Sequence, residues 1–201
     1  MGLLDGLWAA LGLRAEADAR RDADPEDLFG MSTAYITMEA DLGYESMDVG
    51  ALCFSGVQSR TFREAVAEVE AILEASQADT GTEFAIVEDD HGYKWVVLDE
   101  DDPEDLVTSM HFAADTFIEH GYGSRLLAAL FAYRNEEGPV YWIYSFRRGA
   151  FYPFAPRADR ERDTSTEFSL ESTLDGELTV ESDREYWHPL WPSRRGTHPW
   201  E

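Results

Sequence analysis

Five histidines, one cysteine and 41 acidic residues are the side chains of this 201-residue chain that could take part in catalysis or hold a metal. His111 and His120 lie nine residues apart, and this spacing turns them away from each other on a helix. His91 is expected in a hairpin turn. His188 and His198 lie in an aromatic tail and lack a carboxylate at a metal-ligand spacing. The histidines therefore predict no shared metal site.

The acidic residues do not single out a catalytic pair or a calcium loop, because they occur throughout the chain. Asp89–Asp90 and the run from Asp99 to Asp102 lack the alternating oxygen ligands and central glycine of a calcium-binding loop. Phosphate loops, nucleophile elbows and Cys-x-x-Cys pairs are also missing from the sequence. Cys53, between Leu52 and Phe54, is expected to be buried and inert. We therefore predict a protein without enzymatic activity, metal or cofactor.

The net charge of the chain is −25, and its sixteen basic residues are fifteen arginines and a single lysine, Lys94. Abundant acid with almost no lysine is typical of proteins that work in molar salt, where the Debye length is about 3 Å and self-repulsion is screened. This composition predicts that the protein works in the cytoplasm of a halophile. It also excludes nucleic acid as a partner, because no basic stripe is available to neutralise phosphates.

One stretch breaks the acidic pattern, since no Asp or Glu occurs between Glu137 and Asp159. Its first part, Tyr141 to Phe146, alternates as a strand buried on both faces. Its second part does not alternate, and its arginines and aromatics suggest an exposed element that binds a carboxylate or another anionic group. The residues predicted to bind a partner are Arg147, Arg148, Phe151, Tyr152, Phe154 and Arg157.

The N-terminal residues 2–13 read as a short amphipathic helix followed by a charged linker over 14–26. An apolar face at one helical spacing is formed by Leu3, Leu4, Leu7, Trp8 and Leu11. We predict that this face contacts a membrane surface or a partner; the alternative is that it docks on the domain or on a second subunit. The segment lacks the basic start of a signal peptide, and no apolar run reaches the ~18 residues that span a bilayer. The protein is therefore expected to be soluble and cytoplasmic, with peripheral contact at the inner face of the membrane.

The remaining elements follow from caps, turns and periodicity. Helices are expected from Asp24 to Asp41, after a Thr61–Glu64 capping box, and from Asp102 to Gly121. A last short helix is expected from Thr164, although the alternation there also fits a strand. Strands are expected over 48–55, 83–88, 93–99, 126–134, 140–147 and 150–154.

Two hairpins among these strands argue against a parallel sheet. The order of elements predicts an α+β fold, with an antiparallel sheet of five or six strands and helices packed mainly on one face. Residues 27–201 would form this single domain, with the aromatic tail at its C-terminal end.

Several motifs along the whole chain resemble the family of PspA-associated proteins called PspAB. They are MGLLDGLW, LFGMSTAYITMEADLGY, ALCF, HGYKWVV, GYGSRLLAALFAYR, RRGAFYPFAPR and the Trp187 to Trp191 segment WHPLW. The resemblance implies an accessory or regulatory protein that acts beside PspA, the membrane-remodelling protein of phage-shock-type stress. It also implies a link to an HtpX-like membrane protease, and it carries no catalytic residues.

The expected function is therefore that of a non-enzymatic adaptor in a membrane-stress response. One alternative is an enzyme whose pocket is roofed by Tyr152 and the Trp187–Trp191 segment, with its catalytic acid hidden among the others. Another alternative is a dimer, similar to secretion chaperones, that holds an extended client.

Overall fold

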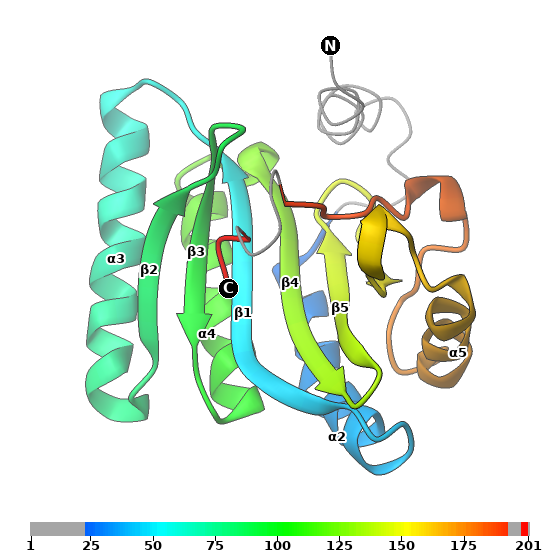
Figure 1. Ribbon diagram of the computed structural model, residues 1–201. Helices are drawn as coiled ribbons and strands as arrows, with labels where there is room; N and C mark the ends of the chain where they lie inside the picture. Colours follow the sequence, from blue (N-terminus) through cyan, green and yellow to red (C-terminus); the bar gives the residue numbers. More distant parts are fainter. Residues whose placement is uncertain (1–22, 193–197, 201) are drawn as a thin grey trace.

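A six-stranded antiparallel sheet with four α-helices forms the framework of the protein, as a computed structural model that describes residues 23–192 and 198–200 shows (Figure 1). The strands are β1 (Glu45–Ser55), β2 (Glu83–Glu88), β3 (Tyr93–Asp99), β4 (Leu126–Asn135), β5 (Gly138–Ser145) and β6 (Ala150–Phe154). The α-helices are α2 (Met31–Ala40), α3 (Arg60–Thr80), α4 (Pro103–Glu119) and α5 (Thr164–Leu174), with short 3-10 helices that include η2 (Pro25–Gly30) and η5 (Arg184–Tyr186). The predicted α+β class is confirmed.

The strand order is β2-β3-β1-β4-β5-β6, and every neighbouring pair is antiparallel. Side chains that alternate along β1 separate two cores. Leu52 and Phe54 face the helices, whereas Ala51 and Cys53 face the other side of the sheet. In Figure 1, helices α2 and α4 lie behind the sheet. Helix α3 stands at the β2 edge of the sheet, and α5 stands at the other edge, beyond β5.

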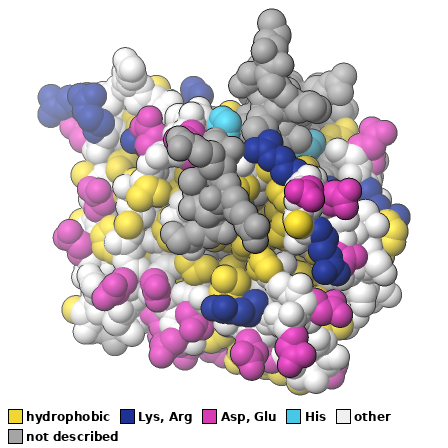
Figure 2. All heavy atoms as spheres, in the orientation of Figure 1, with side chains coloured by type: hydrophobic (Ala, Val, Ile, Leu, Met, Phe, Trp, Pro, Cys, Tyr) yellow, Lys and Arg dark blue, Asp and Glu magenta, His cyan; other side chains and the backbone are white. Residues whose placement is uncertain are grey.

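The second face of the sheet is covered in part by the C-terminal segment. Trp187, Leu190 and Trp200 are buried there, and the rings of Trp200 and Trp95 lie 5.0 Å apart. Figure 2 shows hydrophobic side chains gathered in the middle of this face and acidic side chains around its margin. Because the sheet is covered on both sides, β5 and β6 are apolar on both faces. The prediction that Tyr141 to Phe146 is a doubly buried strand is therefore confirmed, although the strand ends at Ser145.

Most of the predicted elements are present, and two helix starts differ by one or two residues. Ser59, rather than Thr61, caps α3, because its hydroxyl accepts the backbone N–H of Phe62 at 3.0 Å. Asp163, rather than Thr164, caps α5 and accepts from the backbone N–H of Thr166. The alternative of a strand in this last segment is wrong.

The predicted N-terminal helix over 2–13 and most of its linker lie outside the described residues. Within the linker range, Asp24 caps η2 and Ala23 packs against the helix-side core, so the domain includes residues before 27. Across the part of the chain that the structure describes, no helix is both long and apolar enough to cross a membrane.

Candidate functional site: a groove beside the β2–β3 hairpin

The segment predicted to bind a partner forms strand β6 and its flanks, and most of it is buried. Arg148 is 4% exposed, and Phe151, Tyr152 and Phe154 are 1%, 1% and 0% exposed. The prediction of an exposed element is wrong for these four residues, because the C-terminal segment and α5 cover the strand. Only Arg157 is exposed, and Arg147 is half-buried.

The acids that balance the arginines of this segment lie further along the chain. Arg148 Nε donates to Glu181 Oε2 at 2.7 Å, and its guanidinium lies 3.7 Å from the centre of the Tyr186 ring. Arg157 pairs with the capping residue Asp163. The acid-free stretch thus packs against residues further along the chain, and those residues supply the carboxylates that pair with its arginines.

A second buried carboxylate fixes the end of β6. Glu167, 1% exposed, accepts from the backbone N–H of Ala155 at 3.0 Å and pairs with Arg162 at 2.8 Å. Arg162 also donates to the backbone carbonyl of Trp187. These bonds tie β6, α5 and the C-terminal segment together, so the arginine–aromatic run has a structural role in this fold.

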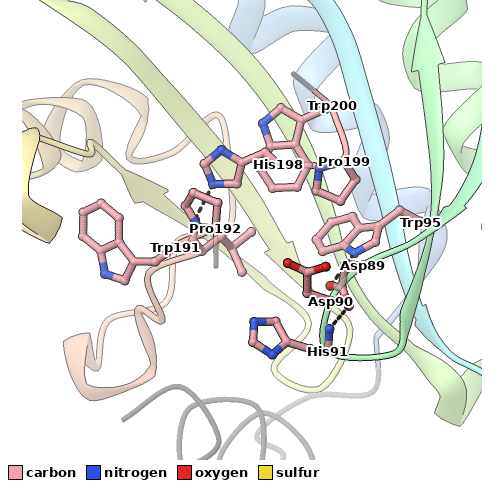
Figure 3. A pocket seen from close by; sticks show the side chains of 10 residues that line it. Asp89, Asp90, His91, Trp95, Trp191, Pro192, His198, Pro199 and Trp200 are labelled. Atoms are coloured by element: carbon pink, nitrogen blue, oxygen red, sulfur yellow. Dashed lines mark hydrogen bonds between the residues drawn. The ribbon is translucent and has the colours of Figure 1, made fainter. Parts of the chain in front are cut away.

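Three C-terminal residues, Trp191, His198 and Trp200, line a small cavity on the second face of the sheet, together with acidic residues of the β2–β3 turn. Figure 3 shows Asp89, Asp90 and His91 of the β2–β3 turn facing His198 and Trp200. The cavity has a volume of about 30 Å³, which is room for one or two waters rather than a substrate.

The chemistry of this cavity is also limited by its hydrogen bonds. Asp89 accepts from the backbone N–H groups of His91 and Tyr93 and from the indole N–H of Trp95, at 2.9 to 3.0 Å. With these three bonds, the carboxylate of Asp89 holds the turn of the hairpin in place. Tyr152 does not line the cavity; its hydroxyl donates to the carbonyl of His188. Within residues 23–192 and 198–200, no three His, Cys, Asp or Glu side chains are placed to hold a metal ion.

Burial keeps two further side chains, His188 and Cys53, in their uncharged forms. Burial, and then the charge of Arg162, lowers the pKa of His188. Burial also raises the pKa of the Cys53 thiol, which is fully enclosed in the sheet. Cys53 is therefore a buried, protonated thiol, as the sequence predicts.

The larger hollow is a groove of about 470 Å³ between α3 and the β2–β3 hairpin, within the usual size range of ligand-binding pockets. One flank of α3 and the residues that follow β1 form its apolar part. These apolar residues are Val57, Phe62, Val66 and Ala67.

Charged side chains line the same groove with both signs. Lys94 Nζ lies 3.1 Å from Glu88 Oε2, and Arg63 and Glu70 project from α3. A lining without net charge is unusual on a chain of −25, and it includes the single lysine of the sequence. An apolar floor with fixed charges of both signs can bind a peptide segment.

Sequence reasoning missed this groove. Its residues come from four separate segments, and nothing in their spacing shows that α3 and the hairpin tip leave a hollow. The one available signal was Lys94, the lysine retained in a chain that otherwise uses arginine.

The chain is an α+β protein with a groove of about 470 Å³ beside the β2–β3 hairpin. It belongs to the PspAB family, PspA associated protein B, whose model matches residues 1–200. No curated protein and no solved structure matches it. The resemblance read from the motifs is thereby confirmed, and an accessory role tied to PspA fits the family.

Proposed function

We propose that the protein is a non-enzymatic adaptor that binds a PspA-type protein in a membrane-stress response of the phage-shock kind. The family match over residues 1–200 is the observation that carries this proposal. The groove beside the β2–β3 hairpin supports it, because it is the larger of the hollows described above and suits a peptide segment.

The proposed setting is the cytoplasm of a haloarchaeon, at the inner face of the membrane. The charge of −25 and the single lysine support a salt-rich cytoplasm. The predicted helix over 2–13 would contact the membrane or the partner through its apolar face, and an HtpX-like membrane protease is a further proposed partner. In the arginine–aromatic segment, only Arg147 and Arg157 keep the exposure that a contact needs.

Co-purification tests the central proposal. The tagged full chain is recovered from its own cells in molar salt, and the bound proteins are identified by mass spectrometry. We expect the PspA-type protein to be enriched at least about tenfold over an unrelated acidic bait, which corresponds to about 1.4 kcal/mol of preference. Equal recovery of the PspA-type protein with both baits would refute the adaptor role.

A deletion of residues 1–13 tests the membrane part of the proposal separately. We expect the full chain to be divided between the membrane and soluble fractions and the shortened chain to move to the soluble fraction, because burial of the five large apolar side chains of the predicted helix is lost. Unchanged fractionation would show that the helix has another role, while the partner proposal would stand.

A further inference from the structure

Large apolar side chains are exposed on the helices that cover one face of the sheet. Within residues 23–192 and 198–200, four large hydrophobic side chains are exposed, and three of them belong to η2, α2 and α4. They are Phe29, Ile36 and Phe112, which are 36%, 54% and 46% exposed. The fourth, Phe168, lies on α5 and is 43% exposed.

The first three of these side chains share one surface. The rings of Phe29 and Phe112 flank the buried ring of His111, with centres 4.8 and 5.7 Å from it. Because η2 continues into α2 with helical backbone at Met31, Ile36 lies two turns after Phe29 on the same side, and Met31 on the opposite side faces the core. We call Phe29, Ile36 and Phe112 the outer helix patch. Apolar side chains that gather on one exposed face indicate a contact surface.

The first described residues lie beside this patch. Ala23 packs against the helix-side core, and Glu26 Oε1 lies 3.2 Å from His111 Nε2. Only residues 14–22 separate Ala23 from the predicted amphipathic segment 2–13, and nine extended residues reach about 30 Å. The segment can therefore return to the patch directly, without crossing the sheet.

The predicted helix matches the patch in length. Its apolar face runs from Leu3 to Leu11, which is about 12 Å along a helix axis at 1.5 Å per residue. The distance from Phe29 to Ile36 along η2 and α2 is about 11 Å by the same measure. One apolar helix face can therefore cover the other over its whole length.

Charge favours this segment over a second copy of the domain. Residues 1–13 contain one acid, Asp5, in a chain with 41 acids. The margin of the patch is acidic: Glu26 is exposed beside it, and so is Glu119, two turns after Phe112 on the same side of α4. A second domain would bring further acids against these residues, whereas the N-terminal segment brings almost none.

We propose that residues 2–13 dock on the outer helix patch of their own chain, with the apolar face of the predicted helix against the three exposed side chains. The docked segment has its apolar face covered, so a membrane or a partner must compete with the patch for it. This inference goes beyond the adaptor role and does not depend on it, because it concerns the chain alone.

Disulfide trapping tests the contact in the full chain in molar salt. Under mild oxidation, Leu7→Cys with Ile36→Cys should form an intramolecular disulfide at least about tenfold faster than Leu7→Cys with Phe168→Cys, because only close positions can be bridged. Phe168 is the matched control, since it is similarly exposed but lies on α5. The native Cys53 is fully buried and does not compete.

Hydrogen–deuterium exchange of residues 2–13 gives a second readout that requires no new cysteine. These amides should exchange at least about tenfold more slowly in the wild type than in a Phe29→Ser, Phe112→Ser variant, because docking protects the helix. Phe168→Ser removes an equally exposed ring elsewhere and should leave the exchange unchanged. Circular dichroism checks that both variants fold.

The outcomes are distinct. Equal trapping rates for the two cysteine pairs, or equal exchange in the wild type and the patch variant, overturn the docking and leave the adaptor role intact. Disulfides that join two chains, together with a dimer by light scattering, assign the patch to the segment of a second copy and overturn docking within one chain. Fast trapping at Ile36 together with protection that only the patch variant loses supports the proposal.

Discussion

The buried pair of Arg148 and Glu181 shows at the scale of single residues how an acidic protein holds an arginine in its interior. The two side chains are 4% and 5% exposed, and their charged atoms lie 2.7 Å apart. Glu181 also accepts the backbone N–H of Asp183 through its other oxygen. A buried pair of this kind adds little net stability compared with apolar residues, but loss of one partner is costly because the other charge stays buried.

Glu181→Ala should therefore lower the free energy of unfolding by about 3–5 kcal/mol. Arg148→Met combined with Glu181→Leu should recover most of this loss. Glu171→Ala is the matched control, since it removes the more exposed pair with Arg184 and should cost about 0–1 kcal/mol. Chemical denaturation at constant salt measures all three. A loss for Glu181→Ala no larger than that for Glu171→Ala would contradict the role of the buried pair.

The residue types alone could not reveal this arrangement. Arg147 and Arg148 were both predicted in an exposed element, because the residues after Phe146 do not alternate as a strand does. In the structure the strand ends at Ser145, and the turn that follows directs Arg148 towards a glutamate 33 positions later. Contacts at such a separation leave no local pattern. Cys53 was predictable because its immediate apolar neighbours already imply burial.

At the scale of elements, the contact between β1 and α4 depends on a residue without a side chain. A Cβ at Gly50 would lie 2.7 Å from Met110 Cε, 3.1 Å from Leu106 Cδ1 and 3.3 Å from the carbonyl oxygen of Leu130. Glycine at this position lets the helix lie close to the middle strand of the sheet.

Gly50→Ala should consequently destabilise the fold by about 1–3 kcal/mol, because the added methyl group must displace packed side chains of α4. Gly56→Ala is the matched control at the end of the same strand. Its Cβ would lie 3.6 Å from Lys94 Cε, an ordinary contact, so the change should stay within about 0.5 kcal/mol. Thermal unfolding of the two variants compares them directly, and equal midpoints would contradict the close approach of β1 and α4.

The start of α5 gives a pH-dependent prediction. The backbone N–H of Thr166, the side chain of Arg157 and the hydroxyl of Thr166 hold the pKa of Asp163 at about 2, below the ~3.9 of an unfolded aspartate. A lowered pKa in the folded state means that the ionised cap stabilises the protein above pH ~4 and that this contribution fades as the pH falls towards 2.

Asp163→Asn keeps an oxygen that can cap the helix but cannot ionise. The wild type should be about 1 kcal/mol more stable than this variant at neutral pH, and the difference should shrink between pH ~4 and ~2. Denaturant midpoints measured across this range give the difference at each pH. A difference that is independent of pH would show that the charge of Asp163 does not contribute.

Elements with local signals were predictable from the sequence, and their exact caps were less so. The β2–β3 hairpin has the predicted bounds, and α4 begins directly after its predicted cap Asp102 and ends two residues before Gly121, because turn residues, caps and periodicity agree. Ser59 and Asp163 were missed as caps because a threonine one or two positions later also has a side-chain oxygen that can accept a helix N–H group. The groove is different in kind: it exists because α3 and the hairpin tip diverge, and this angle is a tertiary property.

For the whole molecule, the distribution of charge sets the condition under which the fold is stable. Forty-one acids occupy a chain whose interior pairs include Arg148–Glu181 and Arg162–Glu167, so most of the remaining acids repel one another at the surface. The Debye length falls from about 30 Å in 0.01 M salt to about 3 Å in 1 M salt. Repulsion across the molecule is therefore present in dilute buffer and largely removed in molar salt.

The unfolding midpoint should rise by roughly 10 °C between 0.05 M and 2 M KCl, since several kcal/mol of repulsion are screened at about 2–4 °C per kcal/mol for a chain of this size. Differential scanning fluorimetry measures the rise.

Part of any rise reflects the general effect of salt on apolar burial, so a charge variant supplies the control. Glu74→Gln, Glu119→Gln and Glu136→Gln together lower the net charge from −25 to −22 at exposed positions and leave the core unchanged. This variant should be more stable than the wild type in dilute buffer and equal to it in 2 M KCl. A parallel shift of both proteins at every salt concentration would mean that surface repulsion does not govern their stability.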